Sequence, residues 1–179
     1  MPGDYCFADG VDIKVDVTAN DVKFRIDGGE FKTTGNTFSC SNMIVYGVGG
    51  TGMHFNGNGN NYCSSVTFYM ESGGVTWNGN SEQDLSAPTS GDYKGLLIYL
   101  PAGNPSLVKL NGTSNSKLVG SVIAPGSEIR LNGVANSKGF DTQLIGSWIN
   151  IAGASNTVIN FNPNNQYSPP AAPTIELTK

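Results

Sequence analysis

Hydrophobic and polar residues alternate along much of this chain in short runs that end at Asn, Gly, Ser or Asp. In 108–110 and in 129–131 the outer two residues are apolar, and Asn-Gly follows each run. Alternation with a period of two buries one face of a β-strand. Gly and Asn tolerate the left-handed backbone of a tight corner. In no stretch of the sequence do apolar residues recur with the period of an α-helix. The pattern therefore predicts an all-β chain of short strands joined by corners.

One phrase recurs along the chain: an apolar residue, then a polar or small residue, then Gly. In chain order the phrase begins at Phe55, Trp77, Leu110, Leu131 and Ile151, with a weaker copy at Ile26. The last three copies follow at almost equal steps, whereas longer steps elsewhere indicate that some turns carry insertions. A coil of about 20 residues cannot bury its own apolar face, so successive coils must stack. We predict a single-stranded β-solenoid, a right-handed parallel β-helix with irregular N-terminal coils.

The expected organisation is one β-helix domain over residues 1–163 and a proline-rich extended tail over 164–179. Within residues 1–21 we expect an irregular leader followed by an alternating strand at 11–17. The polar stretch 81–94 is expected to project from the solenoid as a loop, because insertions in solenoids map to loops on one face.

The end of the tail alternates once more, with Ile175 and Leu177 as its apolar positions. One interpretation is a frayed terminus. The other is a candidate assembly strand that adds to the sheet edge of a neighbouring subunit.

Composition narrows the class of protein. The chain has 24 Gly and 20 Asn among 179 residues, only 13% charged residues and a net charge of −4. No basic stripe interleaves with aromatic residues, which argues against nucleic acid as a partner. No apolar run is long enough to span a membrane, and the start of the chain does not resemble a signal peptide. Sparse charge with abundant Asn, Gly, Ser and Thr is typical of bacterial surface proteins. The alternatives are a cytosolic protein and a piece of a longer exported one; composition favours the second, so we expect an extracellular protein.

The chain has three cysteines, so an intramolecular disulfide leaves one of them unpaired. The separation between Cys40 and Cys63 is close to the length of one coil. Neighbouring strands lie about 4.8 Å apart, which is inside the Cα separation that a disulfide accepts. We expect a disulfide between Cys40 and Cys63 with Cys6 free. A bond between Cys6 and Cys40, or three buried thiols, are the alternatives.

Residues capable of catalysis are few. His54 is the single histidine, without a nucleophile motif or a second His for a metal site. Asp84, Asp92 and Asp141 are the only aspartates in the middle of the chain, and nothing in the sequence brings them together as a glycosidase would require. We expect no enzymatic activity, no metal and no cofactor.

Aromatic residues offer a different kind of site, because their rings pack against sugar faces. The candidate rings are Tyr62, Tyr69, Trp77, Tyr93, Tyr99 and Trp148. Several of them lie in apolar alternation and are expected in the core. Tyr93, in the 81–94 loop, is the best candidate for a surface ring, and Asp84, Asp92 and Tyr93 form the candidate contact surface. Ice binding is a further alternative, although its usual Thr-x-Thr array is missing from the sequence.

Four asparagines occupy the same place in successive repeats: Asn56, Asn78, Asn111 and Asn132. Stacked amides can hydrogen-bond along a solenoid as a ladder. We interpret these four residues as a structural Asn ladder.

Three strings carry a family resemblance: residues 85–99, 118–125 and 143–153. They resemble the C-terminal extracellular region of Tad-type (tight adherence, Flp) pilus-associated, TadE/TadG-like proteins of bacteria, and the similarity covers about residues 50–163. The resemblance implies a β-helical domain outside the cell that follows an N-terminal membrane helix, a segment without a counterpart in this sequence. The phrase at 120–125 is also similar to one in surface choice-of-anchor domains and in ice-binding β-helices.

These observations lead to a functional expectation. The chain is expected to be a non-enzymatic structural or adhesive protein of the bacterial cell surface, a subunit or tip component of a pilus-like filament. Expected partners are further copies of the chain or other pilus proteins, with a glycan as a possible ligand. A carbohydrate- or ice-binding surface module is the alternative.

Overall fold

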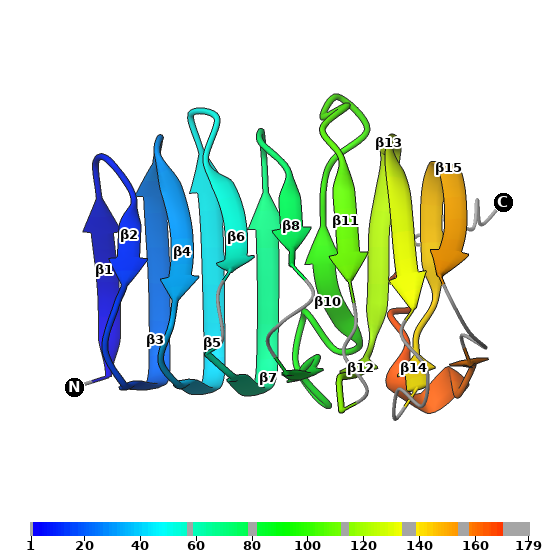
Figure 1. The fold of residues 1–179 in the computed structure, drawn as a ribbon, viewed down its shortest axis with the longest axis horizontal. Coiled ribbons are helices and arrows are strands. Elements are labelled where there is room, and N and C mark those ends of the chain that lie inside the picture. The colour runs from blue at the N-terminus through cyan, green and yellow to red at the C-terminus, as the bar shows by residue number, and fades with distance from the viewer. Residues whose placement is uncertain are drawn as a thin grey trace, which may run out of the picture.

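The structure, a computed structural model, describes residues 2–56, 59–78, 82–111, 115–133, 139–153 and 158–169. It is a parallel β-solenoid of about six turns, as the repeat predicts. Figure 1 shows the coils side by side, with β1 at the N-terminal end and β15 at the C-terminal end. Every strand pairing among the described residues is parallel.

Each coil contributes strand segments to three faces, which we call A, B and C. Face A consists of β1 (Gly3–Phe7), the second parts of β3 (Val17–Asp27), β5 (Phe38–Val48) and β7 (Asn61–Met70), then β10 (Leu96–Tyr99), and the first parts of β13 (Ser121–Gly133) and β15 (Leu144–Gly153). Face B consists of β2 (Val11–Ile13), β4 (Glu30–Thr34), β6 (Gly52–Asn56), β8 (Val75–Trp77), β11 (Val108–Asn111) and the second parts of β13 and β15. Face C consists of the first parts of β3, β5 and β7, then β9 (Gln83–Ser86), β12 (Lys117–Val119), β14 (Gly139–Asp141) and β16 (Ile159–Asn160). A single turn of 3-10 helix, η1 (Pro163–Asn165), follows β16.

The recurring phrase lies in register on face B. Phe55 pairs with Trp77, Trp77 with Leu110, Leu110 with Leu131, and Leu131 with Ile151. The weaker copy at Ile26 does not belong to this column. Ile26 lies on face A, and Thr33 is the residue that pairs with Phe55. The step before Phe55 is therefore one ordinary coil that starts at Thr33, and the longer step from Ile26 does not reflect an insertion.

The core is a continuous stack of apolar side chains between the three faces. Phe31 from face B contacts four rings that come from all three faces, with centroids 5.9–6.4 Å away: Phe24, Phe38, Phe55 and Phe68. Trp77 stacks on Phe55 at 5.9 Å and is buried, so this candidate sugar-binding ring belongs to the core. Stacked rings from successive coils contribute packing energy beyond their buried area.

The N-terminal region is more regular than the sequence indicates. The sequence predicts an irregular leader over residues 1–10, but Gly3–Phe7 form β1, which pairs with β3 from Gly3 opposite Val22 onwards. The strand expected at 11–17 is two strands. β2 ends at Ile13, residues 14–16 form an exposed corner, and Val17 begins β3. Alternation continues through the corner, which is why periodicity alone does not reveal it.

Corners between faces C and A use one residue with a left-handed backbone in each of three coils. These residues are Asp21, Asn42 and Ser65, with φ values of 55°, 50° and 56°. The amide Nδ2 of Asn42 donates to Oδ1 of Asp21 at 2.8 Å, which joins two of these corners. Short polar side chains suit this conformation because they can hydrogen-bond locally.

Candidate functional site

Face A carries a column of tyrosine rings on its outer surface. Tyr46, Tyr69 and Tyr99 pair in register, with ring centroids 4.8 Å and 5.1 Å apart along the column. Their neighbours in sequence point inward and are fully buried, as strand alternation requires. Arg25 lies over the Tyr46 ring at 5.4 Å and continues the column toward the N-terminal end. We call Tyr46, Tyr69 and Tyr99 the tyrosine column.

The column continues toward the C-terminal end as an apolar groove. Ile123 pairs with Tyr99, and Ile145 pairs with Ile123, so both side chains lie on the same outer face. Tyr69, Tyr99 and these two isoleucines form the floor of a groove of about 620 Å³, whose walls include Tyr93 and Pro169. Asp92 and Gln143 add polar groups to its lining. We call this cavity the tyrosine groove. An apolar cavity with a few convergent polar groups is typical of ligand-binding sites.

One wall of the groove comes from a short loop, residues 87–95. Three backbone hydrogen bonds close it: Lys94 N to Gly91 O at 3.1 Å, Gly95 N to Pro88 O at 2.7 Å, and Leu96 N to Tyr93 O at 2.9 Å. These bonds hold Tyr93 exposed at the edge of the groove. The loop is shorter than the predicted 81–94 because residues 83–86 form β9, paired with β7 and β12.

A second wall is the segment 166–169, which follows η1 and packs beside the loop, at the start of the face A strands β10, β13 and β15. Gln166 anchors it: Ser121 Oγ donates to Gln166 Oε1 at 3.2 Å, Gln143 N donates to the same oxygen at 2.9 Å, and Gln166 Nε2 donates to the carbonyl of Asp141 at 3.2 Å. Gly95 permits this approach, because a Cβ there would lie 2.2 Å from the Gln166 carbonyl carbon and φ is +76°. The start of the predicted free tail is thus docked on the solenoid.

The pKa of Tyr69, the middle ring of the column, is shifted by its surroundings. Burial, together with the neighbouring phenols of Tyr46 and Tyr99 and the carboxylate of Glu71, raises the pKa of Tyr69 above its ordinary value of 10.0. At neutral pH the Tyr69 phenol is therefore protonated, and its hydroxyl can donate a hydrogen bond to a ligand.

This shift predicts an effect of Tyr69→Phe at alkaline pH. Because the pKa of Tyr69 is higher in the folded than in the unfolded protein, the protonated phenol stabilises the fold. This stabilisation is fully present below the unfolded pKa of about 10, and it is lost as the pH rises through the folded pKa. We expect the fall in melting temperature above pH 10 to be shallower in Tyr69→Phe. Absorbance titration of the phenolates checks the assignment, and the variant should lack a component that titrates late. If the phenolate component missing from Tyr69→Phe instead titrates below pH 10, the raised pKa of Tyr69 is contradicted.

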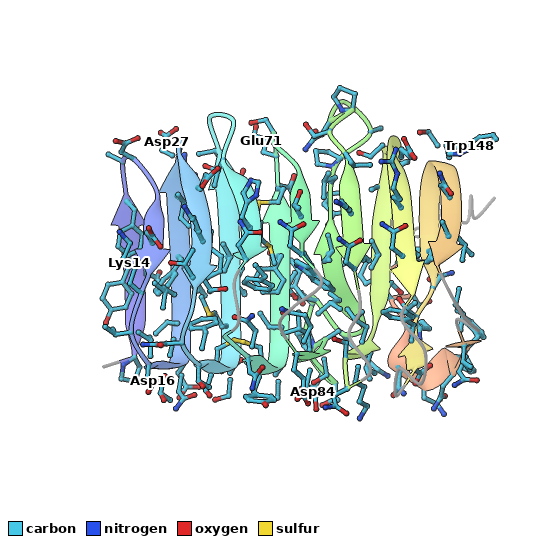
Figure 2. All side chains as sticks on the ribbon, viewed as in Figure 1. Lys14, Asp16, Asp27, Glu71, Asp84 and Trp148 are labelled. Atoms are coloured by element: carbon cyan, nitrogen blue, oxygen red, sulfur yellow. A yellow bond between two sulfur atoms is a disulfide. The ribbon has the colours of Figure 1, made fainter. Side chains whose placement is uncertain are left out.

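The predicted contact surface divides between two faces. Asp92 and Tyr93 lie together at the tyrosine groove. Asp84 does not join them, because it sits in β9 on face C, in register with Tyr62 and Lys117. Figure 2 shows Asp84 at the lower edge of the solenoid and Trp148 at the upper edge. Sequence reasoning names Tyr69 and Tyr99 as rings but misses Tyr46, although the separation between Tyr46 and Tyr69 is close to one coil.

The other structural predictions concern bonds between coils. Cys40 and Cys63 form a disulfide between β5 and β7 on face C, and Cys6 is free and exposed, as expected. Two links of the Asn ladder are present. Asn78 Nδ2 donates to Asn56 Oδ1, and Asn132 Nδ2 donates to Asn111 Oδ1 at 2.7 Å. Ile175 and Leu177, the candidate assembly strand, lie outside the described residues.

Asp141 and His54, two of the residues considered for catalysis, have structural partners. Asp141 accepts hydrogen bonds from Asn162 N at 3.0 Å and from Asn165 Nδ2 at 2.6 Å, so it stabilises the corner after β16. His54 Nε2 lies 3.5 Å from the Glu30 carboxylate on face B. Within the described ranges, no three His, Cys, Asp or Glu side chains gather in a way that could hold a metal ion. The same ranges contain no helix with the length and apolar character that a membrane crossing needs.

The tyrosine groove is therefore the best-formed candidate site in the described part of the chain. No protein-family model matches this chain, and no curated protein or solved structure shows significant similarity to it.

Proposed function

We propose that this chain is a non-enzymatic adhesive and structural protein of the bacterial cell surface, with the tyrosine groove as its adhesive contact and a glycan as its ligand. The observation that supports the adhesive role is the column of rings in register. Aromatic faces pack against the C–H groups of sugars, and Asp92, Gln143 and the tyrosine hydroxyls can bond to sugar hydroxyls. The groove follows the solenoid axis, so it suits an extended saccharide chain.

The disulfide supports an extracellular setting, and the shape of the solenoid supports a structural role. The Cys40–Cys63 disulfide is of the kind that persists in oxidising compartments and is rare in the cytosol. A parallel solenoid is a stiff rod, because each coil is hydrogen-bonded to the next along its length. The resemblance to Tad-type pilus-associated proteins adds a pilus-like filament to the proposal. In that filament the chain would serve as a subunit or tip component.

Ice binding receives less support from the outer surfaces. The outward column of face B runs through Asp12, Lys32, His54, Thr76, Lys109, Arg130 and Asn150. Mixed charges along this column differ from the flat threonine array that ice-binding solenoids commonly present. We therefore favour a glycan as the ligand.

Tyr99→Ala tests the adhesive role. Tyr99 occupies the middle of the groove floor, so removing its ring should weaken glycan binding at least about 10-fold, which corresponds to roughly 1.4 kcal/mol, while Tyr99→Phe should bind almost normally. Binding is measured on a glycan array and then by calorimetry with the best saccharide. Tyr62→Ala is the matched control, because Tyr62 is an exposed ring on face C that does not line the groove. Equal binding by Tyr99→Ala and wild type would rule the groove out as the contact.

A further inference from the structure

The C-terminal end of the solenoid leaves its core positions uncovered by the described residues. On faces B and C the inward positions of the last coil are exposed, whereas their counterparts one coil earlier are buried; on face A, Leu144 is partly buried. The exposed fractions are 41% for Ile149 against 0% for Ile129, 53% for Ile151 against 0% for Leu131, and 39% for Ile159 against 1% for Phe140. These side chains are built for a core but have no following coil among the described residues. Exposed apolar surface of this kind marks an interaction site.

The N-terminal end is open in the complementary way. In the described chain β1 pairs with β3 alone and β2 with β4 alone, so the outer edge of each strand is unpaired. Tyr5, Phe7, Val17 and Phe24 line a shallow apolar hollow of about 260 Å³ at this end. Unpaired edges with apolar side chains are templates for pairing with another chain.

We infer that the C-terminal coil of one copy stacks on the N-terminal coil of a second copy and continues the solenoid. The register columns specify the contacts. β15 would pair with β1 and β2 of the partner subunit, and β16 would pair with the first part of its β3. On face B, Ile149 and Ile151 would then cover Val11 and Ile13 of the partner subunit. Because the free edges at the two ends are opposite edges of one parallel ladder, their unpaired N–H and C=O groups are complementary.

The partner is a second copy because both surfaces belong to the same chain and differ from each other. A contact between two different surfaces of identical subunits is heterologous and grows into an open filament unless it closes into a ring. One coil of about 20 residues on each side is also the size of a stable protein interface, which uses about 20–30 residues per partner. This inference rests on the structural half of the proposed function, and the adhesive half does not depend on it.

The test uses the native Cys6, which lies in the outward column of face A. That column runs through Cys6, Arg25, Tyr46, Tyr69, Tyr99, Ile123 and Ile145. In a stacked pair residue 145 therefore lies beside Cys6 of the partner subunit. Register neighbours can be bridged, since Cys40 and Cys63 are such neighbours with Cα atoms 4.4 Å apart. Under mild oxidation, full-length Ile145→Cys should give a ladder of covalent oligomers on a non-reducing gel.

Controls separate stacking from random oxidation. Lys109→Cys places a thiol on a middle coil of face B, so it should give at least 10-fold less material above the dimer than Ile145→Cys. Adding Ile151→Glu to Ile145→Cys should also reduce the ladder at least 10-fold, because the glutamate places a charge inside the stacking contact. The single subunit tolerates this charge, since residue 151 is exposed there. Circular dichroism and thermal melting confirm that each variant is folded. Electron microscopy of wild-type protein should show rods longer than one subunit.

Two results would overturn the inference. Monomers at all concentrations, with equal cross-linking by Ile145→Cys and Lys109→Cys, would mean that something other than a second copy covers the end. Loss of the ladder on deleting residues 170–179 would mean that strand exchange through Ile175 and Leu177 drives assembly. A persistent ladder after the deletion supports coil stacking. Glycan binding is measured separately on the single variant Ile151→Glu, which leaves every residue that lines the groove in place, so a failure of the adhesive role is distinguishable from a failure of stacking.

Discussion

Phe31→Ala is expected to lower the free energy of unfolding by about 3–5 kcal/mol, the usual cost of truncating a buried aromatic residue. Phe31 is fully buried and contacts rings from faces A, B and C. Alanine would leave a cavity at the point where the three faces meet, and the hydrogen-bonded ladders around it prevent collapse. A domain of ordinary stability has only about 5–15 kcal/mol in total, so the variant should be close to unfolding.

Chemical denaturation followed by circular dichroism measures this effect. Phe161→Ala is the matched control, because it makes the same chemical change at an exposed position of the last coil. We expect the control to change the free energy of unfolding by less than about 0.5 kcal/mol. A loss below about 1 kcal/mol in Phe31→Ala, well under the usual range for a buried aromatic residue, would show that the three faces do not share one tightly packed core.

Removing the disulfide is the second large perturbation. The double variant Cys40→Ala/Cys63→Ala is expected to lose about 3 kcal/mol, because a bond across a sequence separation of 23 restricts the unfolded chain. The bond also joins two neighbouring coils on face C, between β5 and β7.

Denaturant midpoints of the wild type with and without reductant, and of the double variant, measure the contribution. Cys6→Ser is the control, since Cys6 is free and exposed and should leave the midpoint unchanged. Reduction of the Cys6→Ser protein should reproduce the loss seen in the double variant. If reduction left the denaturant midpoint unchanged, the disulfide would not stabilise the protein by restricting its unfolded chain.

Several features could be predicted from the sequence because they repeat at the length of one coil. The phrase at Leu110, Leu131 and Ile151 has the step of one coil and marks face B in register. Cys40 and Cys63 differ by nearly the same step and form the disulfide. Local periodicity is sufficient in these cases because a parallel solenoid converts a constant step in sequence into a contact in space.

Predictions failed where polar residues occupy strand positions. Residues 83–86 read as loop because Gln83 and Asp84 are polar, yet Gln83 is buried and pairs with Asn61, another buried polar residue. Apolar alternation carries no information about such a column. The last coil shows the opposite mismatch between apolar pattern and burial. Ile149 and Ile151 have the pattern of core residues, and their exposure follows from the absence of a described coil beyond them.

By itself, then, the sequence determined the class of fold, the length of the coil, the disulfide and two links of the Asn ladder. The tyrosine groove was decided by tertiary structure alone. Its floor joins Tyr69, Tyr99 and Ile123 across unequal intervals, the first of which contains the 87–95 loop. One wall depends on the bond between Ser121 and Gln166, which are 45 residues apart. Insertions between coils change the step without changing the register. For that reason only the stacked solenoid shows which outward side chains meet.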